Sequence, residues 1–234
     1  GTAVTAVPNT GYHFDAWSDG VTANPRTDTN VQADINVIAN FAADPVHRVS
    51  DGAYFASVAA ALADAGTQDG DTLELAPGTY SGGIVLTKGV HLVGSTGFTP
   101  LAGPISPPSV VIDGGNMVQD GITIAAGVTG ASVSGLEIRN FTRYCVHGVS
   151  GNDNLTITES VLHHCADSGV WINGDVDDVT IDHNEVHDFG FGSGVAGRGI
   201  VIWNGAKRDI TISDNYVHDG AGCCGIELQD GTAT

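Results

Sequence analysis

The chain has 234 residues, 41% of them apolar, so it can bury the core of one large domain or of a small and a medium domain. Eight Lys and Arg stand against 27 Asp and Glu, and the formal charge of −19 opposes binding to nucleic acid and to anionic membranes. No apolar run approaches the roughly 18 residues of a membrane span. Frequent Gly, Thr, Asn, Asp, Val and Ile favour short strands separated by turns.

Residues 1–43 form the first segment of distinct composition. Alternation in TAVTAV and DINVIANF predicts half-buried strands, and PNTG and SDG predict turns. Tyr12, Phe14 and Trp17 predict a compact aromatic core, and packing favours a core role for Trp17 over sugar binding.

This segment carries PN-x-G-Y-x-F-x-x-W-S-D-G, then an NP turn and a strand ending in ANF. The pattern resembles the divergent internalin-type B-repeat of bacterial surface proteins. The resemblance implies a small β module that acts as a spacer or contact unit, with its opening strand cut off before Gly1. We therefore expect the sequence to be a fragment or a processed chain.

Residues 44–51 are expected to form a linker. Apolar residues then recur at helical spacing in YFASVAAALADAG, which predicts a helix over about residues 54–66, with Ser50 or Asp51 as its N-cap. Strands interrupted by PGTY and TKG follow, and residues 97–109 read as a Pro-rich insertion.

The remaining chain is periodic. Four segments align without gaps, and they begin at Ala131, Leu155, Val179 and Ile210. Their starts are 24, 24 and 31 residues apart, and the long interval contains the Gly-rich loop GFGSGVAGR. One such unit cannot bury its own apolar residues, so the period predicts stacked coils. In this register the inward residues are Ile138, Leu162, Val186 and Val217.

The entry segment FASVAAALADAG…IVLTKGVHLVG and the N-x-V-H-D…G-I repeats resemble the right-handed parallel β-helix superfamily of pectin-lyase-like proteins. The resemblance runs from about Gly52 to Thr234. It implies an all-β fold, a right-handed single-stranded parallel β-helix over residues 52–234, with an N-terminal capping helix that covers the open end of the solenoid. The small N-terminal β module precedes it.

The stretch VTIDHNEVHDFG raises the question of a metal site. In the aligned repeats one outward column consists of Arg139, His163, His187 and His218. Ligand atoms of a first-row ion lie ~2.0–2.1 Å from it, whereas neighbouring strands are about 4.8 Å apart and a stack supplies no third ligand. We therefore expect the histidines to be structural.

Asn184 and Asn215, with Ser160 in the coil beneath them, are expected at a turn. Asn tolerates left-handed backbone geometry there, and its side chain can hydrogen-bond to its neighbours in a ladder.

Enzymes of the β-helix superfamily act on one lateral face through outward residues of successive strands. The corresponding outward column here is Thr123, His147, Trp171, Val201 and Glu227. The catalytic candidates are His147 as a proton carrier, Trp171 as a ring that stacks on a sugar, and Glu227 as a carboxylate. Neither a paired-carboxylate motif nor a lyase motif accompanies them.

The turns that follow this column are rich in carboxylates, which suit calcium, and the candidate ligands are Asp175, Asp177 and Asp178. The four cysteines fit no CxxC zinc or redox spacing. Cys145 and Cys165 fit a disulfide or two buried thiols equally well. Adjacent Cys223 and Cys224 are not expected to bond to each other, because the ring would strain the peptide between them.

Three functions are compatible with these patterns. The favoured one is an exported, cell-surface or extracellular structural or adhesive β-helix that takes part in an assembly or filament. Its partners would be copies of itself, other surface proteins or polysaccharide. The alternative is a carbohydrate-active enzyme, a polysaccharide lyase, epimerase or hydrolase, that acts on the lateral face. The third is sugar binding without turnover.

Overall fold

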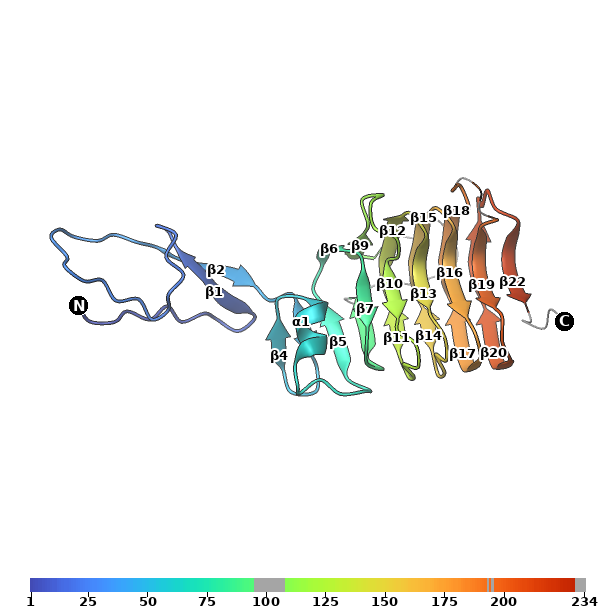
Figure 1. Cartoon of the computed structure of the whole chain (residues 1–234), viewed down its shortest axis with the longest axis horizontal. Coiled ribbons are helices and arrows are strands. Elements are labelled where there is room, and N and C mark those ends of the chain that lie inside the picture. The colour runs from blue at the N-terminus through green and yellow to red at the C-terminus, as the bar shows by residue number, and fades with distance from the viewer. Residues whose placement is uncertain (95–107, 193, 195, 230–234) are drawn as a thin grey trace.

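The computed structural model describes residues 1–94, 108–192, 194 and 196–229. Almost all of its regular elements are strands, and most of them stack side by side in a rod that follows a small N-terminal module (Figure 1). Residues 97–107 of the expected Pro-rich insertion lie outside the described residues.

The N-terminal module is built on an antiparallel pair, β1 (Tyr12–Trp17) and β2 (Ala39–Ala43). The first predicted strand, TAVTAV, contributes only an isolated bridge between Val4 and Arg26. Trp17 is 6% exposed, and its indole nitrogen donates to the carbonyl oxygen of Ala23 at 3.0 Å. Trp17 is therefore a core residue, as its packing predicted.

The aromatic core of this module differs from the prediction in one member. Phe14 packs against Trp17 with ring centroids 5.5 Å apart, and against Phe41 with centroids 6.2 Å apart. Tyr12 is 50% exposed, so its placement in the core was wrong. It lies opposite Ala43 at the end of a two-stranded sheet, while Phe41, itself 40% exposed, lies directly opposite Phe14 and contacts its ring.

The β-helix begins earlier than expected. Strand β3 (Val46–Arg48), inside the expected linker, pairs antiparallel with β4 (Ala53–Phe55) and with the first parallel strand, β5 (Thr72–Leu75). Residues 46–48 are thus part of a sheet, and the expected linker over 44–51 is correspondingly shorter.

The helix α1 (Val58–Ala63) is shorter than the predicted 54–66. Its N-cap is Ser57, whose hydroxyl accepts from the backbone nitrogen of Ala60 at 3.1 Å, so the assignment of the cap to Ser50 or Asp51 was wrong. The reason is that β4 occupies the first residues of the predicted helix. The apolar side of α1 is buried against the first coil through Val58, Ala61 and Leu62.

Three sheets of stacked strands form the rod (Figure 1). The first sheet has the order β22 (Cys224–Gln229), β19 (Arg198–Trp203), β16 (Ser168–Asn173), β13 (Tyr144–Gly148), β10 (Ile122–Ile124) and β7 (Ile84–Leu86). The second has the order β20 (Lys207–Ser213), β17 (Val176–Asp182), β14 (Thr156–Thr158), β11 (Ser132–Ser134), β8 (His91–Gly94) and β5, then β3 and β4. The third has the order β21 (Tyr216–His218), β18 (Glu185–Phe189), β15 (Val161–Cys165), β12 (Glu137–Phe141), β9 (Val110–Asp113) and β6 (Gly78–Ser81).

From β5 onward, successive strands along the chain belong to different sheets, so each coil gives one strand to each sheet. Apart from the pairs that involve β3, the pairings within these sheets are parallel. This is the parallel β-helix that the repeats predicted. Six of the seven extra residues of the longest repeat lie between β18 and β19, where the Gly-rich loop was expected, and the seventh lies between β19 and β20.

The interior is a column of aliphatic side chains. Ile138, Leu162 and Val186 are fully buried and face one another in register, and Val217 packs on the end of this column. The predicted inward column is therefore confirmed. Stacking alone makes this possible, because each coil covers the apolar residues of the next.

A disulfide joins Cys145 of β13 to Cys165 of β15, with the Cα atoms 5.6 Å apart. The sequence left open whether Cys145 and Cys165 form a disulfide or remain two buried thiols, and the structure contains the disulfide. Both residues are fully buried at a corner of the coil. Because they belong to consecutive coils, the bridge ties one coil to the next.

The turn between the second and third sheets carries the predicted ladder. The side-chain oxygen of Asn184 accepts from the backbone nitrogen of Ser160 at 3.1 Å, and that of Asn215 accepts from the backbone nitrogen of Asn184 at 3.0 Å. The left-handed residues are those just before them, His183 (φ 53°) and Asp214 (φ 54°), and not the asparagines themselves. Asparagine is selected here by its hydrogen bonds.

Candidate functional site

The lateral face of the first sheet carries the outward column that the repeats predicted. Neighbouring strands place its members opposite one another in the order Thr123, His147, Trp171, Val201 and Glu227. Val201 is fully buried between Trp171 and Glu227, whereas the other four are half-buried. The register is confirmed, but the column is not a simple row of exposed side chains.

Three rings from consecutive coils form what we call the aromatic row, Tyr144, Trp171 and Trp203. The rings of Tyr144 and Trp171 are stacked, with centroids 5.1 Å apart and planes inclined by 16°. The rings of Trp171 and Trp203 are 5.4 Å apart and inclined by 30°. Tyr144 and Trp203 were missed in the sequence. Trp203 lies two residues beyond Val201, so strand alternation predicts it on the same face. Tyr144 lies three residues before His147, so alternation places Tyr144 on the opposite face.

Two arginines lie over the aromatic row. The guanidinium of Arg143 is 4.8 Å from the centroid of Tyr144, and that of Arg198 is 4.7 Å from Trp203 and 5.8 Å from Trp171. Such contacts hold the rings and the cations in fixed positions. Both arginines also face a carboxylate, Arg143 that of Asp120 and Arg198 that of Glu227.

Asp120 connects Arg143 to the predicted candidate His147. One of its carboxylate oxygens accepts from Arg143 Nε at 2.8 Å, and the other lies 3.0 Å from His147 Nδ1. The side chain is only 10% exposed, and this burial, the largest influence, acts to raise its pKa. The hydrogen bonds from His147 and Arg143 outweigh it and hold the pKa of Asp120 at about 2. Asp120 therefore stays ionised and orients the imidazole.

Glu227 has a partner that the sequence did not reveal. Its carboxylate forms an ion pair with Arg198, whose side chain also donates to the carbonyl oxygen of Ala196 at 2.7 Å. Burial alone would lower the pKa of Arg198, but the hydrogen bond to Glu227 raises it. The structure thus ties Glu227 to the aromatic row through Arg198.

The candidate calcium ligands are divided between two places. Asp177 and Asp178 lie on an open pocket of about 470 Å³ that Asp153, Asn154 and Asp209 also line. The Asp175 carboxylate instead accepts from the backbone nitrogen of Ala206 at 2.7 Å.

An ion pair already engages part of this acidic pocket, because the Asp177 carboxylate contacts Arg208 at 3.1 Å. Among the described residues, the three candidate aspartates are not a group whose oxygens all lie within 4.8 Å of one another. Calcium binding by Asp175, Asp177 and Asp178 stays a prediction.

The histidine column is present as the alignment predicted. His187 stacks on His163 with centroids 4.7 Å apart and planes inclined by 7°, and on His218 with centroids 5.1 Å apart. In two of the three histidines Nδ1 has a carboxylate partner: His187 Nδ1 lies 2.8 Å from Asp188, and His218 Nδ1 lies 2.8 Å from Asp219. His163 Nδ1 instead lies 2.7 Å from a ring nitrogen of His164. The adjacent acids thus serve as hydrogen-bond partners of the stack.

The comparisons with known proteins agree with this architecture. Residues 1–45 match the family model of the divergent InlB B-repeat domain, and residues 120–234 match that of the right handed beta helix region. No curated protein and no solved structure matches the chain significantly.

The chain is thus similar to a B-repeat followed by a right-handed parallel β-helix, a combination that indicates a surface-associated protein. Among the described residues, no helix is long and apolar enough to cross a bilayer.

Proposed function

We propose that this chain is an extracellular, surface-associated adhesive β-helix that binds polysaccharide on its aromatic row. The observation that carries the proposal is the set of three rings from three consecutive coils, Tyr144, Trp171 and Trp203, held against one another at centroid distances of 5.1 and 5.4 Å. Tyr144 is 9% exposed, so the half-buried rings of Trp171 and Trp203 provide the apolar contact for the C–H groups of sugars, and Tyr144 packs against Trp171. The polar groups beside the rings fix orientation.

The polar side chains around the row are planar and already oriented. Arg143 and Arg198 lie over the rings, and Asp120 and Glu227 hold these arginines in place. Preorganised groups lose little conformational freedom when a ligand binds, so even modest contacts contribute to affinity. A repetitive ligand also suits a site that extends along the axis of the rod.

The local charge favours a neutral polysaccharide. Each arginine at the row has a carboxylate partner, so the face offers no excess positive charge to a polyuronate. The whole chain, at −19, repels polyanions in addition. The proposal is therefore binding of a neutral glycan, without a requirement for calcium.

One specific observation favours catalysis as a second candidate. The Asp120 carboxylate orients the imidazole of His147 at 3.0 Å, two coils from Trp203, as expected for a group that moves protons. A hydrolase would also require a second positioned carboxylate, and Glu227 is engaged by Arg198. Binding is the function that more of the site supports.

The test is binding and product analysis on the same polysaccharides. The chain is incubated with insoluble and soluble glycans, neutral and acidic, and bound protein and released oligosaccharides are both measured, the latter by mass spectrometry. We expect binding to at least one neutral glycan and no products. Released oligosaccharides would establish the enzyme instead, and lack of binding to every glycan would refute the proposal.

A further inference from the structure

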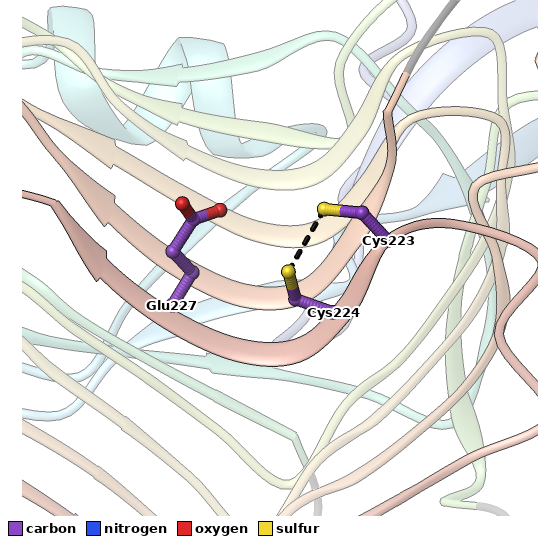
Figure 2. A group of neighbouring side chains, drawn as sticks. All are labelled: Cys223, Cys224 and Glu227. Carbon is purple, nitrogen blue, oxygen red and sulfur yellow. Dashed lines mark hydrogen bonds between the residues drawn. The ribbon is translucent and has the colours of Figure 1, made fainter.

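Three side chains at the start of β22 lie close together outside the aromatic row. Two belong to Cys223 and Cys224, both free thiols, and the third to Glu227. Their sulfur and carboxylate oxygen atoms all lie within 4.8 Å of one another, and the sulfurs are 2.9 Å apart. Figure 2 shows the two thiols and the carboxylate turned toward the same space. Among the described residues, this is the group of three or more potential metal ligands that meets that distance.

Strand bending brings these groups together. Cys224 and Glu227 are three residues apart, so regular alternation would place them on opposite faces. Cys224 begins β22 opposite Arg198, where the chain turns the corner of the coil, and its thiol points toward that of Cys223, with the Glu227 carboxylate beside them (Figure 2). Cys223 is exposed and the other two are half-buried, so an ion from solvent can reach all three.

We propose that Cys223, Cys224 and Glu227 bind a Zn²⁺ ion. Thiolates and carboxylates are both zinc ligands, and softer ions such as Cu⁺ make less use of the carboxylate. Two protein sulfurs and one oxygen leave the fourth tetrahedral position for water or for a group from outside. Binding releases the two thiol protons to solvent, so the complex forms as Zn²⁺ replaces them.

The geometry needs only a small adjustment. Two sulfurs at about 2.3 Å from one tetrahedral zinc lie roughly 3.8 Å apart, so the thiols must separate from the observed 2.9 Å. Side-chain rotation at an exposed corner provides this. Arg198 donates to one oxygen of Glu227, and a carboxylate has lone pairs for an arginine and a metal together. The arginine would then orient the metal-bound carboxylate from outside.

The experiment uses the full chain with its surface thiols reduced, in excess Mg²⁺ to saturate its many carboxylates. Co²⁺ serves as a spectroscopic probe and Zn²⁺ affinity is measured by competition with a chromophoric chelator. We expect one ion per chain and a sulfur-to-cobalt charge-transfer band in the near ultraviolet. Cys223→Ser and Cys224→Ser should each weaken Zn²⁺ binding at least about tenfold and reduce the band.

The variant Glu227→Gln distinguishes the contribution of the carboxylate to metal binding from that of the thiols. This variant should keep the sulfur-to-cobalt band and bind Zn²⁺ about tenfold more weakly, whereas Glu159→Gln, at an exposed turn, should bind like the wild type. Far-ultraviolet circular dichroism and melting temperature check that each variant is folded.

Three results would overturn the proposal. They are the absence of the sulfur-to-cobalt band in the reduced wild-type chain, Zn²⁺ affinity that is unchanged in both cysteine variants, and one ion shared by two chains. The first needs no variant, so misfolding of a mutant cannot obscure the answer. Glycan binding is not a readout here, so failure of the zinc site and failure of the proposed adhesive function are distinguishable.

Discussion

The ring of Tyr144 stacks on the ring of Trp171 in the next coil, although the backbone register places Tyr144 opposite Ser168 and Trp171 opposite His147. The two side chains therefore lean toward each other along the strands. The stack is inclined by only 16°, and it joins residues that the repeat alone would keep apart, with Tyr144, 9% exposed, at its buried end.

The first prediction concerns Trp171, the middle ring of the aromatic row. Trp171→Ala removes the contacts to both Tyr144 and Trp203, so glycan affinity should fall by about tenfold or more, as for a central aromatic anchor. Isothermal titration calorimetry with a glycan that binds in the polysaccharide panel measures this affinity. The matched control is Tyr216→Ala, which removes a 61% exposed ring from the third sheet. Equal losses in both variants would contradict the assignment of the binding face.

A second prediction follows from the lowered pKa of Asp120. Its value of about 2 in the folded chain lies below the roughly 3.9 of an unfolded aspartate. The ionised carboxylate therefore stabilises the fold above about pH 4, and this contribution is lost as the pH falls from about 4 toward 2. Asp120→Asn should lower the free energy of unfolding at neutral pH by about 2 kcal/mol.

Urea unfolding at neutral and acid pH measures this effect. Between about pH 4 and pH 2, the wild type should lose more stability than Asp120→Asn, because the variant has no carboxylate to protonate there. Asp34→Asn, at an exposed position of the N-terminal module, is the control and should follow the wild type. Parallel curves for wild type and Asp120→Asn would show that the ion pair does not stabilise the fold.

The third prediction tests the asparagine ladder. Asn184 is 2% exposed, and its amide nitrogen donates to the carbonyl oxygens of Ile157 and Asp182 at 2.9 Å each. Asn184→Ala removes these buried hydrogen bonds and the acceptor of the Ser160 nitrogen, so the free energy of unfolding should fall by about 3 kcal/mol. Asn173→Ala, which loses one exposed hydrogen bond, should change stability by less than about 0.5 kcal/mol. Similar melting temperatures for the two variants would argue against the ladder.

The fourth prediction compares two glycines at equivalent positions of neighbouring coils. A Cβ at Gly199 would lie 2.4 Å from a methyl of Val217 and 2.5 Å from the carbonyl oxygen of Gly225, whereas one at Gly225 would meet Val217 at an ordinary 3.6 Å. Gly199→Ala should therefore cost about 2 kcal/mol through overpacking, and Gly225→Ala less than about 1 kcal/mol. Thermal unfolding of the pair measures the difference, and a larger loss at Gly225 would show that the coils are packed differently.

Strand alternation and the repeat length were sufficient to predict the column of Ile138, Leu162 and Val186, the stack of His187 on its neighbours, and the outward position of Trp171. In a solenoid the residue above each position is simply the one that is one repeat further along the chain. Local pattern and tertiary neighbourhood therefore coincide, and an approximate alignment of the repeats gives the packing of the core.

The corners of the coils are different, because strands bend there and alternation no longer tells which way a side chain points. The convergence of Cys224 on Glu227, the disulfide between Cys145 and Cys165, and the position of Tyr144 over Trp171 all occur at or beside corners. The hydrogen bond between Asp120 and His147 likewise connects residues that are 27 positions apart, which is not a whole repeat.

The amino-acid sequence by itself determined that the chain stacks into a parallel β-helix behind a module similar to a B-repeat, because apolar residues spaced by one repeat can be buried only by neighbouring coils. Only the tertiary structure decided which polar and aromatic side chains meet. Their contacts depend on side-chain lean and strand curvature, and these arise when the coils pack and leave no trace in the periodicity of the sequence.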